Sequence, residues 1–215
     1  MTALQVHGLE VSYDRPVVSG FDLTIEPEEC VALMGPSGSG KSSIIGCVVG
    51  LQTPQAGTIE VGGVSMPTTA AKRARLRREL VGVAYQDAGL LPELTVAENV
   101  AVTMLFDGQP REAALAASRQ SLARVGLAGH TEKLIHEISG GQAQRVALAR
   151  ALVRATAVLL VADEPTASLD PSTASEITRL IVVQARARRM GALIGTHDPQ
   201  VAQACDRVVD LRSAA

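Results

Sequence analysis

The sequence predicts an α/β protein with a parallel β-sheet core, an antiparallel β-layer near the N-terminus and an inserted set of helices. Short apolar runs alternate with helical segments over most of the chain, which is typical of a parallel sheet with crossover helices. Two N-terminal runs instead alternate apolar and polar residues, as strands of a half-exposed antiparallel sheet do. Between Gln86 and Ala155 the strand patterns give way to helical periodicity.

Each expected element has its own local pattern. The strand-like runs of the core are 30–34, 57–61, 80–85, 157–162, 192–195 and 207–211. The antiparallel layer comprises 4–13 and 17–25. Helical periodicity covers 71–80, 94–106 and 111–127, and a further helix is expected to begin near Gly140.

Composition and charge exclude several classes of protein. The 215 residues are 47% hydrophobic, which is enough for a sizeable core in one large domain or a core with an insert. Twenty basic and 22 acidic side chains leave a formal charge of −2, so no overall field attracts nucleic acid or anionic lipid. Apolar runs such as 44–51 are shorter than the roughly 20 residues that span a bilayer. Because the first residues lack a secretory signal pattern, we expect a cytosolic location.

Two groups of side chains are expected to be structural. Segment 71–80 carries a run of basic residues that we interpret as a solvated helix face rather than a binding patch: Lys72, Arg73, Arg75, Arg77 and Arg78. Cys30, Cys47 and Cys205 are widely spaced and lie in apolar surroundings. We therefore expect them to be small buried side chains rather than disulfide partners or metal ligands.

A phosphate-binding loop is predicted at "GPSGSGKS", residues 35–42. The pattern G-x-x-x-x-G-K-[ST] follows a buried-type strand and precedes a helical run, which is the context that this loop requires. Its glycines let backbone amides surround a β-phosphate, Lys41 reaches the β and γ oxygens, and Ser42 offers a hydroxyl to Mg²⁺.

A carboxylate pair follows the strand at 157–162. Asp163 is expected to orient a metal-bound water, and Glu164 to act as the general base for the attacking water. An acidic loop after a strand is common by itself, so this assignment depends on the phosphate-binding loop.

His197 follows another strand, at the sheet edge that carries ligands in open α/β proteins, so contact with a γ-phosphate is plausible there. Asp198 and Pro199 resemble the cap and first position of a helix. The remaining histidines, His7, His130 and His136, are interpreted as ordinary loop residues.

The segment "ISGGQ", residues 138–142, opens a helix. Ser139 and Gln142 have capping-box spacing, so each can satisfy a backbone donor of the other. The capping box does not explain Gly140 and Gly141, since glycine in a first turn costs about 1 kcal/mol against alanine. Bare N–H groups at a helix N-terminus would suit a phosphate.

In combination, these motifs resemble the nucleotide-binding subunit of an ATP-binding-cassette (ABC) transporter almost end to end. In chain order they are Tyr13 before the first loop, the Walker A loop 35–42, Gln86, the signature 138–142, the Walker B acids Asp163 and Glu164, "SLD" at 168–170, and His197. The resemblance implies a P-loop NTPase (RecA-like) core with an antiparallel β-layer, formed by residues 1–86 and 156–215. Residues 87–155 would form the helical subdomain that carries the signature.

The resemblance also implies roles for these residues. Catalysis would involve Glu164, His197, Lys41 and Gln86, and magnesium would be bound by Ser42, Gln86 and Asp163. Tyr13 would stack on adenine, and Asp170 would cross a dimer seam. The full set expected to contact ATP is Tyr13, Gly35, Pro36, Ser37, Gly38, Ser39, Gly40, Lys41, Ser42, Ser43, Ser139, Gly140, Gly141, Gln142 and Asp170.

In this family the signature of one subunit covers the ATP held by the other. The chain is therefore expected to dimerise around two Mg-ATP and to drive a separate transmembrane permease from the inner face of the cell membrane. Some residues depart from the family pattern: Ile138 replaces leucine, Ser43 stands where threonine is usual, and Glu28 stands where glycine is usual. None of these changes removes a catalytic group.

The segments "VADEPTASLD", "GLLPELTVAENV" and "GTHD" resemble the branch of lipoprotein-release, macrolide-efflux, haem-efflux and cell-division ATPases. Two alternatives stay open: a soluble ABC ATPase of a cytosolic assembly machine, such as one for iron–sulfur clusters, and a signalling module that regulates cell-wall enzymes through a membrane subunit. The cargo is not encoded in this chain, because the membrane subunit selects it.

Overall fold

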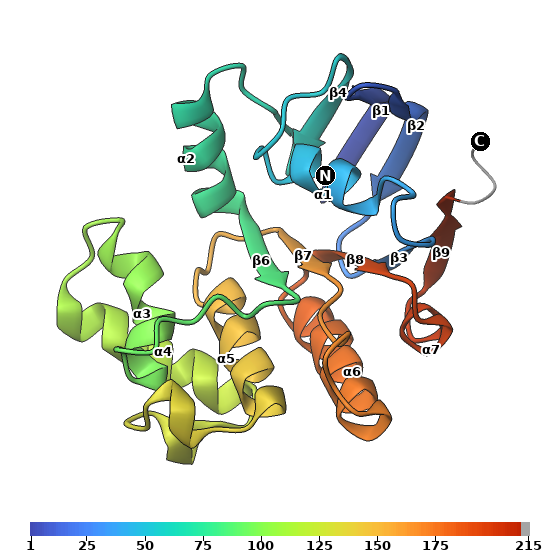
Figure 1. Ribbon diagram of the computed structural model, residues 1–215. Helices are drawn as coiled ribbons and strands as arrows, with labels where there is room; N and C mark the ends of the chain where they lie inside the picture. Colours follow the sequence, from blue (N-terminus) through green and yellow to red (C-terminus); the bar gives the residue numbers. More distant parts are fainter. Residues whose placement is uncertain (212–215) are drawn as a thin grey trace.

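The computed structural model describes residues 1–211, which form two stacked β-sheets with helices around them (Figure 1). The core sheet is parallel throughout, with strand order β6-β7-β8-β3-β9. Its strands are β3 (Cys30–Met34), β6 (Val81–Tyr85), β7 (Leu159–Asp163), β8 (Gly191–Thr196) and β9 (Arg207–Asp210). The second sheet is antiparallel, with order β2-β1-β4-β5, and consists of β1 (Leu4–Ser12), β2 (Pro16–Ile25), β4 (Ala56–Val61) and β5 (Val64–Ser65).

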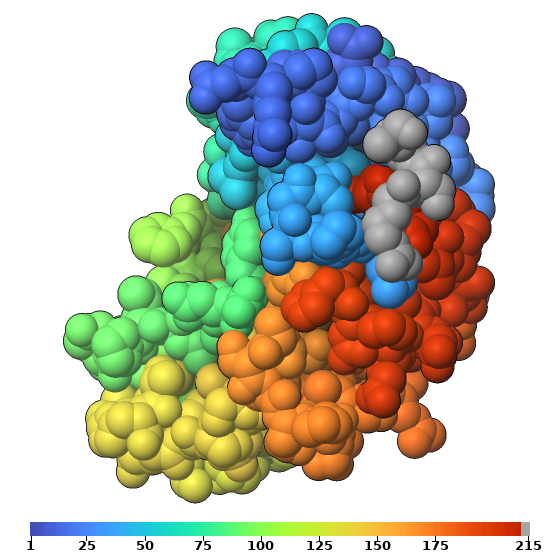
Figure 2. All heavy atoms as spheres, turned by 45° about the vertical axis from the view of Figure 1, so that its right-hand side comes forward, coloured from blue at the N-terminus to red at the C-terminus, as the bar shows by residue number. Residues whose placement is uncertain are grey.

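Helices cover both faces of the core sheet, and further helices belong to the insert. They are α1 (Lys41–Val48), α2 (Ala70–Leu80), α3 (Val96–Leu105), α4 (Arg111–Arg124), α5 (Gly140–Leu152), α6 (Pro171–Ala187) and α7 (Pro199–Gln203), with short 3₁₀ turns at Ala128–His130 and Ile135–Glu137. Figure 2 shows the N-terminal layer (blue) at one end of the molecule and the insert (yellow) at the other, with the pale blue segment that includes α1 between them.

Alternate residues of the central strands point to opposite faces, because side chains of a strand alternate with a period of two. Leu159 and Val161 of β7 pack with α1 and the antiparallel layer. Leu160 of β7 and Ile194 of β8 pack with α5 and α6. The parallel sheet is therefore covered on both faces, as the continuous apolar runs of its strands require.

The expectation for 57–61 was wrong in one respect. This strand exists as β4, but it pairs antiparallel with β1, with Leu4 opposite Val61 and Gln5 opposite Glu60. Its burial alternates at the end, with Ile59 and Val61 inside and Glu60 between them half-buried. Such alternation is typical of a strand with one solvated face, so the strand belongs to the outer layer and not to the parallel core.

Helices fill the span between β6 and β7. Helices α3, α4 and α5 succeed one another there, and Ser118 of α4 binds the carbonyl of Ala97 in α3 while Ser121 binds that of Ala149 in α5. The predicted helical insert is thus confirmed as secondary structure. Within residues 1–211, no helix is long and apolar enough to cross a membrane.

The basic helix α2 is only partly a solvated face. Arg73 donates hydrogen bonds to the carbonyls of Gly50 and Thr68, and Arg77 donates to the carbonyl of Val49, 3.1 Å away. Val49 and Gly50 follow the last turn of α1, where carbonyl groups lack helical partners and positive charge is favourable. These arginines therefore attach α2 to the helix that begins with Lys41.

Candidate functional site

The loop of residues 35–40 connects β3, in the interior of the core sheet, to the first turn of α1. Gly38 and Gly40 have φ of 81° and 95°, which glycine adopts without strain and other residues do not. A Cβ on Gly35 would lie 2.5 Å from Ser39 Oγ. The loop is therefore closed tightly on itself.

Lys41 is 6% exposed, and its ammonium lies inside the loop. Nζ donates to the carbonyl oxygens of Gly35 at 2.6 Å and Pro36 at 3.0 Å. It also lies 3.6 Å from Oε1 of Glu164, at the end of β7. The ammonium of Lys41 is thus held in the loop by two carbonyl oxygens, which the oxygens of an anionic ligand could replace.

Asp163 ends β7, where parallel strands present their carboxyl ends at one edge of the sheet. Its Oδ1 is buried and has no hydrogen-bond partner among residues 1–211. Burial raises the pKa of this carboxyl, the hydroxyl of Ser42 lowers it, and the negative charge of Glu164 raises it further. A buried carboxylate oxygen without a partner, next to a serine hydroxyl, fits a hard divalent cation that prefers oxygen ligands.

Glu164 and His197 form the second part of this cluster. His197 Nδ1 lies 2.9 Å from both carboxylate oxygens of Glu164, and because an ionised carboxylate only accepts, Nδ1 is the donor. Glu164 has a positive φ of 48°, and its N–H bonds to the carbonyl of Gly195 on β8. Backbone strain of this kind concentrates at functional sites. The imidazole of His197 is 60% exposed and faces the open side of the cluster.

Gly195 belongs to the site, although its sequence pattern did not single it out. A Cβ at this position would lie 2.9 Å from Asp163 Oδ1 and 2.7 Å from Ile45 Cδ1. A side chain there would displace the carboxylate of Asp163 and the end of the Ile45 side chain. The only sequence signal is a glycine inside an apolar strand, which indicates close approach of another group.

Tyr13 lies beside the loop. Its ring is 61% exposed, and its hydroxyl donates to Gln52 Oε1 at 3.1 Å and lies 3.3 Å from Ser43 Oγ. These contacts hold an exposed aromatic face next to the first turn of α1. Ser43, where the resemblance expects threonine, is thus a partner of the tyrosine.

The predicted helix start at Ser139 is confirmed. Ser139 caps α5, its N–H bonds to Gln142 Oε1 at 3.0 Å, and the N–H of Gln142 bonds to Ser139 Oγ at 3.3 Å. The two glycines that follow differ in their surroundings. A Cβ on Gly141 would lie 2.6 Å from Thr173 Cγ2, whereas a Cβ on Gly140 would meet only Leu169, at 3.9 Å. Packing within the chain explains Gly141 but leaves Gly140 unexplained.

His130 is not the ordinary loop residue that the sequence indicated. Its Nε2 lies 3.2 Å from Nε2 of Gln142, whose Oε1 already accepts from the backbone of Ser139. The amide therefore donates and the imidazole accepts, which places the proton of a neutral ring on Nδ1. That Nδ1 is buried and lacks a partner among residues 1–211. His130 thus orients the glutamine of the signature.

Gln86 lies on the surface after β6, and its carbonyl oxygen accepts from Gln144 Nε2 at 2.6 Å. The same amide lies 3.3 Å from the carbonyl of Tyr85. Gln144 was missed as a site residue. The sequence could have indicated this residue, because Gln144 is a polar side chain on the face of α5 that also buries Ala147, Leu148 and Ala151. It joins the start of the signature helix to the segment of Gln86.

Asp170 is confirmed as a helix cap. Its Oδ1 accepts from the N–H groups of Ser172 and Thr173, both at 3.1 Å, at the start of α6. Hydrogen bonds from Ser172 and Thr173 hold the pKa of this carboxyl well below its ordinary value. Asp198 likewise caps α7, with Pro199 as its first residue.

The fold thus assembles one part of the predicted site and leaves another part elsewhere. Lys41, Asp163, Glu164 and His197 gather at the carboxyl edge of the parallel strands. The signature begins α5, which Figure 1 draws beside the helices of the insert, whereas α1 lies against the antiparallel strands. Pro36, Ser37 and Ser39 stay within the loop, and the buried Ser39 Oγ has no partner among residues 1–211.

Comparison with known proteins gives a consistent result. Residues 18–167 match a family model described as ABC transporter. The chain is 42% identical over 197 residues to the lipoprotein-releasing system ATP-binding protein LolD 1 of Rhodospirillum rubrum, covering 91% of this chain and 87% of that protein. It is 38% identical to the L-cystine transport system ATP-binding protein TcyN of Escherichia coli, covering 97% of this chain and 86% of the other.

Among solved structures, the chain resembles the dimeric, post-hydrolysis state of the ATP-binding cassette MJ0796 bound to ADP and Pi. The TM-score is 0.86 at 27% sequence identity, with 98% of this chain and 95% of the other covered. The two-sheet architecture with inserted helices is therefore shared over nearly the whole of both chains.

Proposed function

Because the chain belongs to the ABC transporter family and is one of its ATPases, we propose that it dimerises around two Mg-ATP and drives a separate transmembrane permease. One observation carries this proposal. Lys41, Asp163, Glu164 and His197 form one reactive cluster in which His197 is 60% exposed, and within residues 1–211 a Cβ on Gly140 at the tip of α5 would meet only Leu169. In a symmetric homodimer, the α5 N-terminus of each subunit could cover the cluster of the other subunit, so both sites would be completed together.

The loop holds the phosphates of ATP. Backbone N–H groups of the loop, which Pro36 lacks, bind the β-phosphate, and Lys41 exchanges the carbonyls of Gly35 and Pro36 for β and γ oxygens. This exchange also removes the ammonium from Glu164, which frees that carboxylate. Tyr13 presents its exposed ring to adenine.

Magnesium binding fits the oxygens present. Ser42 and Asp163 provide a hydroxyl and a buried carboxylate oxygen, and Gln86 provides an amide from the neighbouring strand end. When bound, the ion neutralises charge on the β and γ phosphate oxygens. Few protein ligands are needed, because Mg²⁺ keeps several waters and takes the rest from the phosphates.

Glu164 is the general base that accepts a proton from the attacking water. His197 orients this carboxylate through its Nδ1–H, and donation from Nε2 to the γ-phosphate would require a second proton on the ring. Across the dimer, the hydroxyl of Ser139 and the N–H groups of Gly140 and Gly141 cover the γ-phosphate of the partner's nucleotide, Gln142 contacts that nucleotide, and Asp170 crosses the seam.

The transported cargo is proposed from the relatives. LolD 1 belongs to a lipoprotein-releasing system, and this agrees with the branch that the sequence motifs resemble. TcyN belongs to an L-cystine transport system, and its similarity to this chain supports the proposal that the permease determines the substrate. Residues 87–155 are proposed as the helical subdomain that meets the permease at the inner face of the membrane, and residues 1–86 and 156–215 as the ATP-binding core.

The proposal is tested with Glu164→Gln and ATP. This variant should lower ATP turnover by about 10² to 10⁴ and trap a nucleotide-bound dimer, measured by light scattering after size exclusion. Adding Gly140→Asp to it should abolish the dimer, because a carboxylate would face the partner's phosphate. Gly129→Asp is the matched control, since a Cβ at Gly129 meets nothing within 4 Å. A Glu164→Gln chain that stays monomeric at saturating ATP contradicts the proposal.

Lys41→Ala should lose ATP binding, because it removes the ammonium from the loop.

Purification with the native partner separates transport from the alternatives. A multispan membrane protein is expected, whereas a soluble scaffold would indicate an assembly machine.

A further inference from the structure

Two cysteines that are 175 positions apart in the sequence meet at the edge of the parallel sheet. Cys30 Sγ lies 3.3 Å from Cys205 Sγ, with the Cys30 thiol as donor. The backbone fixes this contact on both sides, because the N–H of Asp206 bonds to the carbonyl of Cys30 at 2.9 Å and the carboxylate of Asp206 accepts from the N–H of Cys30 at 2.8 Å. Both cysteines are reduced in the structure.

We propose that Cys205 and Cys30 form an oxidisable dithiol, in which Cys205 reacts with a peroxide and Cys30 then closes a reversible disulfide. The separation of the sulfur atoms has to shrink by little more than 1 Å to reach the bonded distance of about 2.05 Å. The cysteines therefore need no rearrangement of strands to join.

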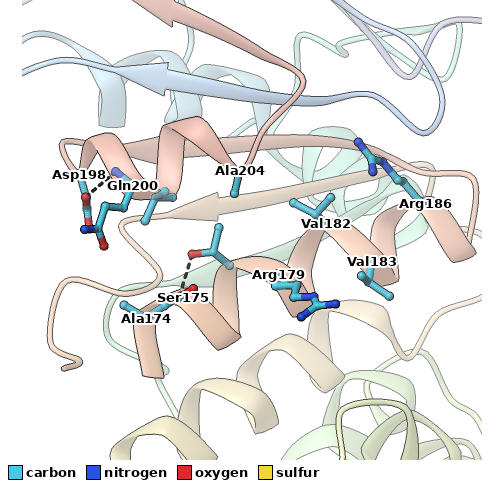
Figure 3. Close-up of a pocket in the computed structure, with 11 residues that line it drawn as sticks. Ala174, Ser175, Arg179, Val182, Val183, Arg186, Asp198, Gln200 and Ala204 are labelled. Atoms are coloured by element: carbon cyan, nitrogen blue, oxygen red, sulfur yellow. Dashed lines mark hydrogen bonds between the residues drawn. The ribbon is translucent and has the colours of Figure 1, made fainter. Parts of the chain in front are cut away.

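The two thiols differ in access. Cys30 is 1% exposed, at the start of β3, whereas Cys205 is half-buried, just after α7. Its neighbour Ala204 lines a groove of about 380 Å³ between α6 and α7, together with Arg186, but Cys205 itself does not line this groove (Figure 3). The half-buried Cys205 is therefore the more accessible of the two thiols, and Cys30 is the buried one.

The electrostatic surroundings agree with this order. The hydrogen bond from Cys30 lowers the pKa of the Cys205 thiol, burial and the carboxylate of Asp206 raise it, and the guanidinium of Arg186 lowers it. Arg186 is held there by an ion pair with Asp206 Oδ1 at 2.5 Å. The hydrogen bond to Cys205 and burial raise the pKa of the Cys30 thiol, so this thiol keeps its proton while Cys205 reacts with the peroxide. A reactive, accessible thiol beside a resolving thiol is the arrangement of redox-sensing cysteines.

The chemistry balances with a peroxide as the oxidant. The Cys205 thiol loses its proton to solvent and its thiolate attacks one peroxide oxygen, the O–O bond breaks, and a sulfenic acid and a hydroxide result, which takes up a proton from solvent to become one water. Cys30 sulfur then attacks Cys205 sulfur, the S–O bond breaks, and the hydroxyl leaves as a second water with the Cys30 proton. Two thiols lose two electrons in total, and the peroxide gains them.

The disulfide would join elements that carry the reactive cluster. Strand β3 runs from Cys30 to the phosphate-binding loop, and α7 starts two residues after His197. A disulfide would close the chain segment between Cys30 and Cys205 into a loop, which lowers the conformational entropy of the unfolded state. The oxidised protein should therefore be more resistant to heat.

The experiment treats the folded, reduced chain with hydrogen peroxide, followed by alkylation and mass analysis of proteolytic fragments. We expect a Cys30–Cys205 linked peptide that dithiothreitol reverses, with Cys47 still alkylated after unfolding, and a thermal midpoint higher by several degrees. Cys205→Ala should leave Cys30 reduced, and Cys47→Ala should form the linkage as the wild type does.

Three results would overturn the inference. The first is that Cys30 and Cys205 both remain alkylatable at a peroxide dose that fully oxidises free glutathione. The second is that the linkage forms only in urea. The third is that the oxidised chain melts at the temperature of the reduced chain, because a native linkage has to constrain the unfolded state.

Discussion

Single residues with a left-handed backbone mark two different situations in this chain. Glu28, Glu164 and Arg189 have positive φ, where a Cβ is strained. For Glu164 this strain lies within the reactive cluster, beside Lys41 and His197. For Glu28 it lies in the turn before β3, and its N–H bonds to the carbonyl of Met190. This is the position where the family resemblance leads one to expect glycine.

Replacing Glu28 by glycine should stabilise the protein. The change relieves a φ of 69° at a cost of one weak ion pair, in which Arg189 Nε lies 3.8 Å from Glu28 Oε1. The free energy of unfolding should rise by about 1 kcal/mol, measured by urea denaturation. Glu28→Ala is the control, because it loses the ion pair but keeps the strain and should not be stabilised. Equal effects of glycine and alanine would contradict this assignment.

Asp163 should make stability depend on pH. Its carboxyl has a raised pKa, mainly from burial, so the folded state binds its proton more tightly than the unfolded state does. Wild-type stability from this group is therefore present at low pH and is lost as the pH rises above 3.8 through the folded pKa. Asp163→Asn should unfold at higher urea concentration at neutral pH, with the advantage shrinking toward pH 4, while ATP turnover is lost. An advantage that grows on acidification would contradict the prediction.

Helix α5 combines structural and reactive demands within one element. Its capping box with Ser139 and Gln142 is local, His130 connects it to the 3₁₀ turn Ala128–His130, and Gln144 connects it to the segment of Gln86. Within residues 1–211, a Cβ on Gly140 at the tip of α5 would meet only Leu169, at 3.9 Å. Contacts within the chain therefore hold α5 in place, and Gly140 at its start is exposed.

The two glycines of this tip should respond differently to alanine. Gly141→Ala forces a Cβ against the β-branched Thr173 and should cost about 1 to 3 kcal/mol of unfolding free energy. Gly140→Ala has room and gains helix propensity of up to about 1 kcal/mol, yet kcat/KM for ATP should fall at least tenfold if the tip covers a partner's phosphate. Urea denaturation and ATPase kinetics on both variants separate the roles. Full turnover by a stable Gly140→Ala chain would show that the tip binds no phosphate.

The molecule as a whole is held together where the parallel sheet meets the insert. A Cβ on Gly82 of β6 would lie 2.3 Å from the carbonyl oxygen of Ala151 in α5. Farther out, Asp107 pairs with Arg154 at 2.6 Å and with Arg78 of α2 at 3.3 Å. The insert shares the hydrophobic cluster of α6 and the sheet, so it is not a separate core.

Gly82→Ala should therefore weaken the entire fold. Because backbone approaches backbone at this point, no rotamer change can make room, and the unfolding free energy should fall by about 1 to 3 kcal/mol. Gly129→Ala is the control, since a Cβ there meets nothing within 4 Å. Denaturant midpoints of both variants provide the measurement, and equal midpoints would mean that the sheet and α5 are not in close contact.

Most of the fold and of the candidate site could be predicted from local pattern. The phosphate-binding loop, the acids after β7, and the capping box are encoded in short segments, because turn geometry and capping depend on a few neighbouring residues. The strands of the core were recognised by their apolar runs, since burial on both faces leaves no polar alternation.

The remainder depended on contacts between distant segments. The pairing of β4 with β1, the sulfur contact of Cys30 with Cys205, and the bond from His130 to Gln142 join residues whose own neighbourhoods carry no sign of their partners. The clash that makes Gly141 obligatory comes from Thr173, on another helix. The sequence by itself determines which functional side chains are present and how each local turn and helix cap forms. The packing of the two sheets and the insert determines which of these groups meet, because burial, and not sequence distance, brings them together.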